Sequence, residues 1–338
     1  MLPEIRSYLD EVRSHLHLDP ATEMQIVREV YTYFRDSVDE LQANGLSESE
    51  ATKAAIESFG RPRVVARRMY EARSKGSEIE AAISCLPHLI IAGLFISQLW
   101  RNPFWASIAF VSIVCVTLYG WWRGKPSWLY PWVGYSLLPL LIGGYAAAPV
   151  LGQAASSLFW GSGSFPSVWA LLLVLALIGS SLWIIVSTTI RVVRRDWILA
   201  SLMLVPLPIV GAWLLDLEQA GGVFQGATAS VHQLDMSMAL AFITLGVASA
   251  TFVRLRQRVL KVGALLMVCT IAAAAIGHSF WGDYGFFGLL ATSLLMLVFL
   301  LSPALIEAKI GHGEQSGEAW WESSMRWEEA LVGHDRPV

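Results

Sequence analysis

Charged side chains are scarce in this sequence. Only 15% of its 338 residues are Asp, Glu, Lys or Arg, whereas an ordinary globular domain has about 25%. Those that are present crowd into residues 1–80 and 307–338, and the long stretch between these regions carries few. Since 55% of the residues are hydrophobic, this balance argues against an ordinary globular domain and favours a protein embedded in a membrane.

The cysteine content and the net charge of the sequence are also low. The three cysteines, Cys85, Cys115 and Cys269, lie in apolar segments, and none has a second cysteine at CxxC spacing. We therefore expect small buried hydrophobes, and neither disulfides nor metal ligands. The formal net charge is -3, and acids match the basic residues of the N-terminal part. Because no net basic face results, we expect no direct binding of nucleic acid.

Recognisable catalytic motifs are missing as well. The sequence has no P-loop, no G-x-S-x-G, no H-E-x-x-H and no G-x-G-x-x-G after a strand. None of its long apolar segments has a central acid with a basic partner, which a proton relay would need. We therefore expect that the protein is not an enzyme and that it has no catalytic residue, metal site or cofactor.

The first quarter of the chain has the periodicity and the capping signals of a compact helical domain. Four helices are expected, over residues 3–17, 20–44, 47–59 and from 62 onward. The second ends at Gly45, and Ser47 with Glu50 forms a capping box for the third. Gly60 then ends the third helix, and Pro62 starts a fourth that is rich in arginine.

Eight long apolar runs follow, each about long enough to cross a hydrocarbon core of ~30 Å. They cover residues 81–100, 103–122, 128–150, 166–190, 197–215, 236–253, 259–278 and 284–306. Arginine and lysine gather in every second loop, whereas the alternate loops hold only Arg101. Since basic loops mark the cytoplasmic side, we expect a multi-pass protein of the bacterial inner membrane with both termini in the cytoplasm.

The expected architecture is therefore all-α. It consists of a cytoplasmic domain of three or four helices (residues 1–79), an eight-span transmembrane bundle (80–306) and a cytoplasmic tail (307–338). The tail is acidic and rich in tryptophan, as in a short amphipathic helix. Two docking places for it stay open, the membrane surface and the N-terminal domain. We favour the N-terminal domain, because anionic lipid would repel the acids.

Several side chains in or near the spans are candidates for a polar or ligand site. Ionisable residues inside a membrane are functional suspects, and further acids and histidines gather at the predicted outer ends of spans. The candidates are His88, Asp216, His232, Asp235, His278 and Asp283. The alternative is the ordinary polarity of loops, or, for His88, a hydrogen bond to a carbonyl that Pro87 leaves free.

The fifth span is the strongest candidate for a kinked helix, because it contains both Pro206 and Pro208. A related motif occurs twice, at residues 137–140 and again 67 residues later at 204–207. This spacing hints that spans three and four are repeated as spans five and six, an arrangement frequent in transporters but not diagnostic of transport.

The motifs of the first quarter resemble a known module. The residues that carry the resemblance are Gly45, Ser47, Glu50, Ala51, Phe59, Gly60 and Pro62. They follow the pattern G-x-S-x-x-E-A, then F-G-x-P, of the HAAS-type domain, or permease prefix domain, of bacterial membrane proteins, over residues 20–72. Arg61 stands where that family often has aspartate. The resemblance implies a cytoplasmic signalling or regulatory domain fused to varied membrane domains, and it implies no catalytic residue.

These features favour a bacterial inner-membrane regulatory or sensory protein. Its spans would pass a membrane or outer-side signal to a cytoplasmic or membrane protein partner through residues 1–79, with the lipid bilayer as the other partner. One alternative is a transporter or permease component, favoured by the candidate repeat and the kinked span. Another is a structural subunit of a membrane complex. The oligomeric state, the signal and the partner stay open.

Overall fold

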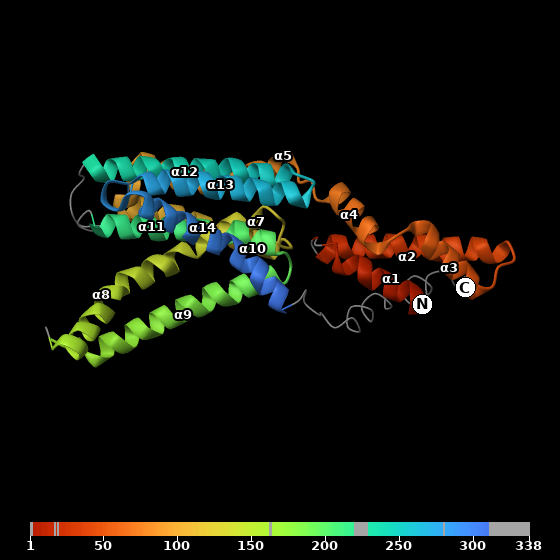
Figure 1. The fold of residues 1–338 in the computed structure, drawn as a ribbon, viewed down its shortest axis with the longest axis horizontal. Coiled ribbons are helices and arrows are strands. Elements are labelled where there is room, and N and C mark those ends of the chain that lie inside the picture. Colours follow the sequence, from red (N-terminus) through yellow and green to blue (C-terminus); the bar gives the residue numbers. More distant parts are fainter. Residues whose placement is uncertain are drawn as a thin grey trace, which may run out of the picture. The chain divides into compact units, whose positions relative to one another are not determined.

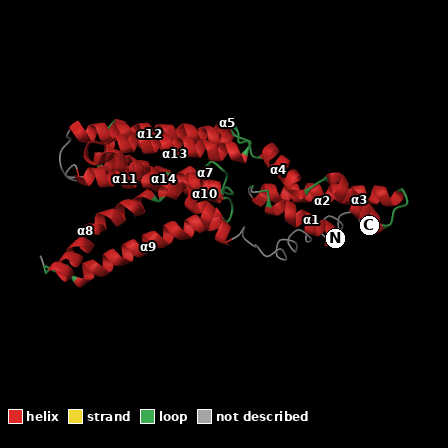
Figure 2. Ribbon diagram, viewed as in Figure 1, coloured by secondary structure: helices red, strands yellow, loops and turns green. Residues whose placement is uncertain are grey.

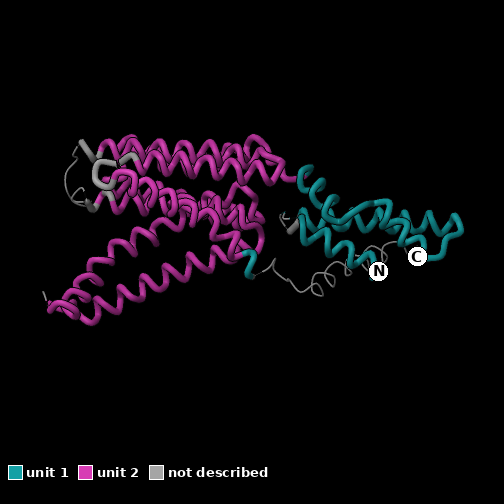
Figure 3. The backbone as a smooth tube through the Cα atoms, in the orientation of Figure 1, with its two compact units in different colours: residues 1–72, 307–338 teal, residues 73–306 magenta. Residues whose placement is uncertain are grey.

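The structure is a computed structural model that describes residues 3–16, 18, 20–161, 164–219, 229–279 and 281–310. Within these ranges all regular structure is helical, and no strand occurs (Figure 2). The chain forms two compact units, residues 1–72 with 307–338 and residues 73–306 (Figure 3). Residues 311–338, which hold most of the expected tail helix, lie outside the described ranges.

The first unit is built from four helices (Figure 1). They are α1 (Pro3–Ser14), α2 (Pro20–Ala43), α3 (Glu48–Phe59) and α4 (Pro62–Arg73). Their apolar faces meet in a closed hydrophobic core that includes the fully buried Leu9, Phe34, Ala55 and Ala66. Because this core is separate from that of the second unit, each unit has its own source of hydrophobic stabilisation.

The second unit contains the long apolar helices. In chain order it has α5 (Glu78–Ile96), the short 3-10 helix η1 (Leu99–Arg101), α6 (Pro103–Trp122), α7 (Leu129–Ser136), α8 (Leu138–Trp160), α9 (Val168–Val193), α10 (Trp197–Leu204), α11 (Pro206–Gln219), α12 (Ala229–Arg254), α13 (Arg258–Ser279) and α14 (Trp281–Ile310). By length and composition, eight segments can cross a membrane, with α7 and α8 forming one and α10 and α11 another. The all-α fold class with about eight spans is thereby confirmed.

The first and third spans differ most in extent from the sequence expectation. The first covers Glu78–Ile96 instead of residues 81–100. Its start is fixed by a capping box in which the Ser77 side chain accepts from the Glu80 amide. The third runs on to Trp160 instead of 150, with Pro149 inside it. A proline is tolerated within a membrane helix because neighbouring groups can satisfy the backbone carbonyl that it leaves free.

The packing separates central from peripheral helices. In the fifth span 89% of the residues in its most apolar 18-residue stretch are buried, whereas in α9 the corresponding share is 11%. The centre is close-packed: α12 packs along α5 and α13, and α7 packs against α10. At Gly134 on α7, a Cβ atom would overlap the Met203 carbonyl of α10, so only glycine permits this approach. The hairpin of α8 and α9 extends away from the other helices (Figure 1).

Candidate functional site

The turn residues of the first unit have the geometry that their types favour. Gly45 and Gly60 adopt φ values of 96° and 97°, in the left-handed region where glycine carries no Cβ penalty. The Ser47 hydroxyl accepts from the Glu50 amide and the Glu50 carboxylate accepts from the Ser47 amide, completing a capping box. The Ser47 hydroxyl also donates to the Glu50 carboxylate at 2.6 Å, and this hydrogen bond, together with the one from the Ser47 amide, lowers the pKa of the exposed Glu50.

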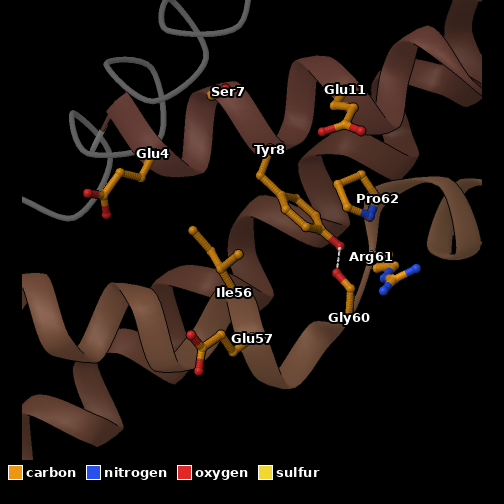
Figure 4. A pocket seen from close by; sticks show the side chains of 9 residues that line it. All are labelled: Glu4, Ser7, Tyr8, Glu11, Ile56, Glu57, Gly60, Arg61 and Pro62. Atoms are coloured by element: carbon orange, nitrogen blue, oxygen red, sulfur yellow. Dashed lines mark hydrogen bonds between the residues drawn. The ribbon is translucent and has the colours of Figure 1, made fainter.

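A shallow pocket of about 490 Å³ lies between α1, α3 and the start of α4. Figure 4 shows the Tyr8 side chain extending from α1 toward the loop at Gly60, whose carbonyl accepts its hydroxyl proton at 2.9 Å. Burial, together with the charge of Glu11, raises the pKa of Tyr8 to about 12. The Tyr8 ring also packs edge-on against Phe34 and Phe59. The phenol therefore joins the core to the loop that precedes α4.

In the second unit, His88 is fully buried on α5. Its Nδ1 lies 2.6 Å from the Tyr135 hydroxyl of α7, and the two rings meet edge-on with centroids 5.0 Å apart. Its Nε2 has no hydrogen-bond partner among the described residues. The partner of this histidine is thus a tyrosine hydroxyl from another span, and no carbonyl left free by Pro87 is needed to explain its burial.

The predicted outer ends of α5 and α12 meet around a buried carboxylate. Asp235 on α12 has no solvent exposure, and its Oδ2 accepts from the Trp100 indole at 3.3 Å. The Arg101 Nη2 atom lies 4.0 Å from the same oxygen. Beside them, the Gln98 amide nitrogen is 2.9 Å from His232 Nδ1. Two of the candidate residues, Asp235 and His232, therefore fasten α12 to the segment that follows α5.

The remaining acidic and histidine candidates cannot be placed in this group. The side chains of Asp216, His278 and Asp283 lie outside the described residues, while the contact of His88 is with Tyr135. In the part of the chain that the structure describes, no three His, Cys, Asp or Glu side chains are grouped so that they could hold a metal ion.

The candidate kink coincides with a helix break. In the fifth span α10 ends at Leu204 and α11 begins at Pro206. The third span is interrupted in the same manner, between Ser136 and Leu138, so the related motifs at 137–140 and 204–207 both accompany a break. Arg191 and Arg258 are also separated by the offset of the candidate repeat, but they do not occupy equivalent places. Arg191 lies in the last turn of α9, whereas Arg258 begins α13.

The segment 74–77, which links α4 to α5, is fixed to the last turn of α12 and to the loop that follows it. The Gly76 amide donates to the Val253 carbonyl at 2.9 Å, and the Ser74 hydroxyl donates to the Arg256 carbonyl at 3.0 Å. A Cβ atom on Gly76 would overlap the Val253 side chain. The adjacent Arg254 and Glu78 form an ion pair at 3.3 Å. Sequence reasoning missed this joint, because nothing local marks residues about 180 apart as neighbours.

The same end of the second unit has a buried ion pair that sequence reasoning also missed. Asp196 precedes α10, and its Oδ1 accepts from the Ile198 amide at 3.0 Å and from Arg258 at 2.9 Å. Burial raises the pKa of Asp196, and the positive charge of Arg258 opposes this rise. The one signal in the sequence was an aspartate directly before a span, in the place of a helix N-cap.

Comparison with known proteins assigns the first unit. Residues 7–68 match the HAAS family model, and the rest of the chain matches no family. The match begins within α1, ahead of the start at residue 20 that the motifs indicated. No curated protein and no solved structure matches the chain. The chain therefore carries a HAAS domain joined to a helical region that matches no family model and is compatible with a multi-pass membrane protein.

Proposed function

We propose that this chain is a regulatory or sensory protein of the bacterial cytoplasmic membrane. Its eight spans register a state of the membrane or of its outer side, and its HAAS domain reports that state to a cytoplasmic or membrane-bound protein. The chain acts without catalysis or a cofactor. The loops rich in arginine and lysine support a cytoplasmic location for both termini, and the HAAS match supports a regulatory role.

The joint at residues 74–77 is the observation that carries this proposal. It holds the chain between the HAAS domain and α5 by hydrogen bonds to Val253 and Arg256, at one end of α12. The other end of α12 carries Asp235, buried among groups that follow α5. Since α12 packs along α5, a change at the Asp235 end that slides or turns α12 would move the attachment point of the HAAS domain.

Affinity purification from the native membrane tests the proposal. The full-length protein is compared with a version that lacks residues 1–73, which removes the HAAS domain but keeps the joint. We expect a regulator or another membrane protein to be recovered only with the full-length chain. Recovery of the same partners with both versions, at equal expression, would show that the HAAS domain is not the reporting part.

Transport is the second candidate function, favoured by one observation. The third and fifth spans are each interrupted after a first segment of 8 residues, and these segments, α7 and α10, pack against each other. Paired interrupted spans in corresponding positions are the arrangement in which transporters build midplane sites. Uptake of a broad panel of labelled solutes by proteoliposomes tests it: uptake that Gly134→Leu abolishes would support transport, and no uptake across the panel would count against it.

A further inference from the structure

The groove between α1 and α3, defined by the pocket that contains Tyr8, has an acidic rim. Glu4 and Glu11 lie on α1 and Glu57 lies on α3, and all three are exposed. Figure 4 shows these carboxylates around the groove, with the partly buried Ile56 between Tyr8 and Glu57. The lining thus holds three carboxylates against one guanidinium, that of Arg61. A segment that enters this groove would be favoured if it were positively charged with a small apolar contact.

The exposed side of α4 has the complementary character. Arg63, Arg67 and Arg68 are all exposed there. Val64 lies among them with 46% of its surface exposed, an apolar side chain without a cover. Arg67 also pairs with Glu71 at 3.0 Å, but its side chain stays 74% exposed. One domain therefore presents an acidic groove with an apolar floor and, on the next helix, a basic face with an apolar centre.

We propose that two copies of this chain dock through their HAAS domains, with the arginine face of α4 in each copy covering the groove between α1 and α3 of the other. In each copy α4 begins at Pro62, which itself lines the groove. A two-fold axis close to this point therefore brings both basic faces over both grooves at once. The contact is then closed and self-complementary, as in most homodimers.

The expected strength of this contact follows from its composition. Exposed ion pairs contribute about twofold to fivefold each to an equilibrium constant, so the charges give orientation and the association between free domains is weak. Two chains held in one membrane meet at a raised effective concentration, which lets a weak contact become populated. Because the charges are exposed, the association should weaken as salt shortens the Debye length from about 10 Å at 0.1 M to about 3 Å at 1 M.

Charge reversal in the full-length protein tests this interface. Labelled chains are reconstituted in lipid vesicles, and energy transfer between copies is measured as a function of their surface density. Glu57→Lys and Arg68→Glu each turn an attraction into a repulsion, so each should weaken self-association about tenfold. The double variant with both changes should associate better than either single variant, because the groove then carries an added positive charge and the face that covers it an added negative charge. Both positions are exposed, and circular dichroism checks that each variant keeps its helices.

A matched control completes the test. Glu40→Lys makes the same charge change at an exposed site on α2, outside the groove, and should leave self-association unchanged. Energy transfer that stays at the random-encounter level for the wild type at every density would overturn the proposal. So would equal self-association in all variants, or a double variant that associates no better than the single ones.

Discussion

Replacing Phe34 by alanine should unfold the HAAS domain while the membrane helices keep their packing. Phe34 has no solvent exposure, and its ring lies 5.2 Å from the ring of Tyr8 and 5.0 Å from that of Phe59. Burial of a phenylalanine and the cavity left by its removal together cost about 3–5 kcal/mol. A single core in a domain of this size supplies about 3–5 kcal/mol of net stability, so the change removes most or all of it.

Limited proteolysis of the full-length protein in detergent measures this effect. Trypsin should cut Phe34→Ala rapidly within residues 20–72, at sites that the folded wild type protects, and should leave the apolar helices intact because their core is separate. Tyr33→Ala is the matched control, since this neighbouring aromatic is 50% exposed and its loss should cost only about 1 kcal/mol. Wild-type resistance in Phe34→Ala would refute the assignment of this side chain to the centre of the core.

Three further outcomes follow from the contacts described above. Tyr8→Phe removes the hydrogen bond to Gly60 and should destabilise the HAAS domain by about 1 kcal/mol. Because the pKa of Tyr8 is raised in the fold, the wild-type domain should also lose stability as pH rises from 10 to 12. Urea unfolding across that pH range should show a smaller loss of stability in the variant. Ser47→Ala should lower the stability of the HAAS domain by about 1 kcal/mol, because the helix cap is lost. Since the pKa of Glu50 is lowered in the fold, the stabilisation from its carboxylate is present above pH 4.5 and is lost as pH falls below that value. Thermal unfolding of the wild type should therefore show lower stability at pH 3 than at pH 6, and equal stability at the two pH values would contradict this role of Glu50. Asp235→Ala leaves the Trp100 indole without its acceptor and should raise hydrogen exchange in residues 98–101 severalfold, whereas unchanged exchange would show that the carboxylate does not hold this segment.

Local signals in the sequence were sufficient to predict most of the helices of this fold. Capping residues such as Ser47 and breakers such as Gly60 act within a few residues of their own position, so helix ends could be predicted closely. The eight spans were predictable because the thickness of a bilayer fixes the length of each apolar run. Pro149 shows the limit of local rules, since the helix continues through a residue that usually ends one.

Contacts between distant parts of the chain could not be predicted in this manner. His88 and Asp235 were recognisable as polar residues in apolar surroundings, but their partners Tyr135 and Trp100 are separated from them by 47 and 135 positions. No spacing rule connects such residues, and the pairing depends on how whole helices pack. The joint at Gly76 was missed for the same reason, because its glycine is required by the proximity of Val253 and not by a turn.

The most direct test of the central claim replaces Gly76 by alanine and measures how much partner protein is recovered with the full-length chain from its native membrane. The new methyl group overlaps the Val253 side chain, and loss of the adjoining hydrogen bond costs about 1 kcal/mol, so the joint should open. Gly93→Ala is the control, since a Cβ there meets nothing within 4 Å. We expect partner recovery to change severalfold in Gly76→Ala and to stay at the wild-type level in Gly93→Ala. Equal recovery from all three proteins would contradict the claim that this joint couples the membrane helices to the HAAS domain.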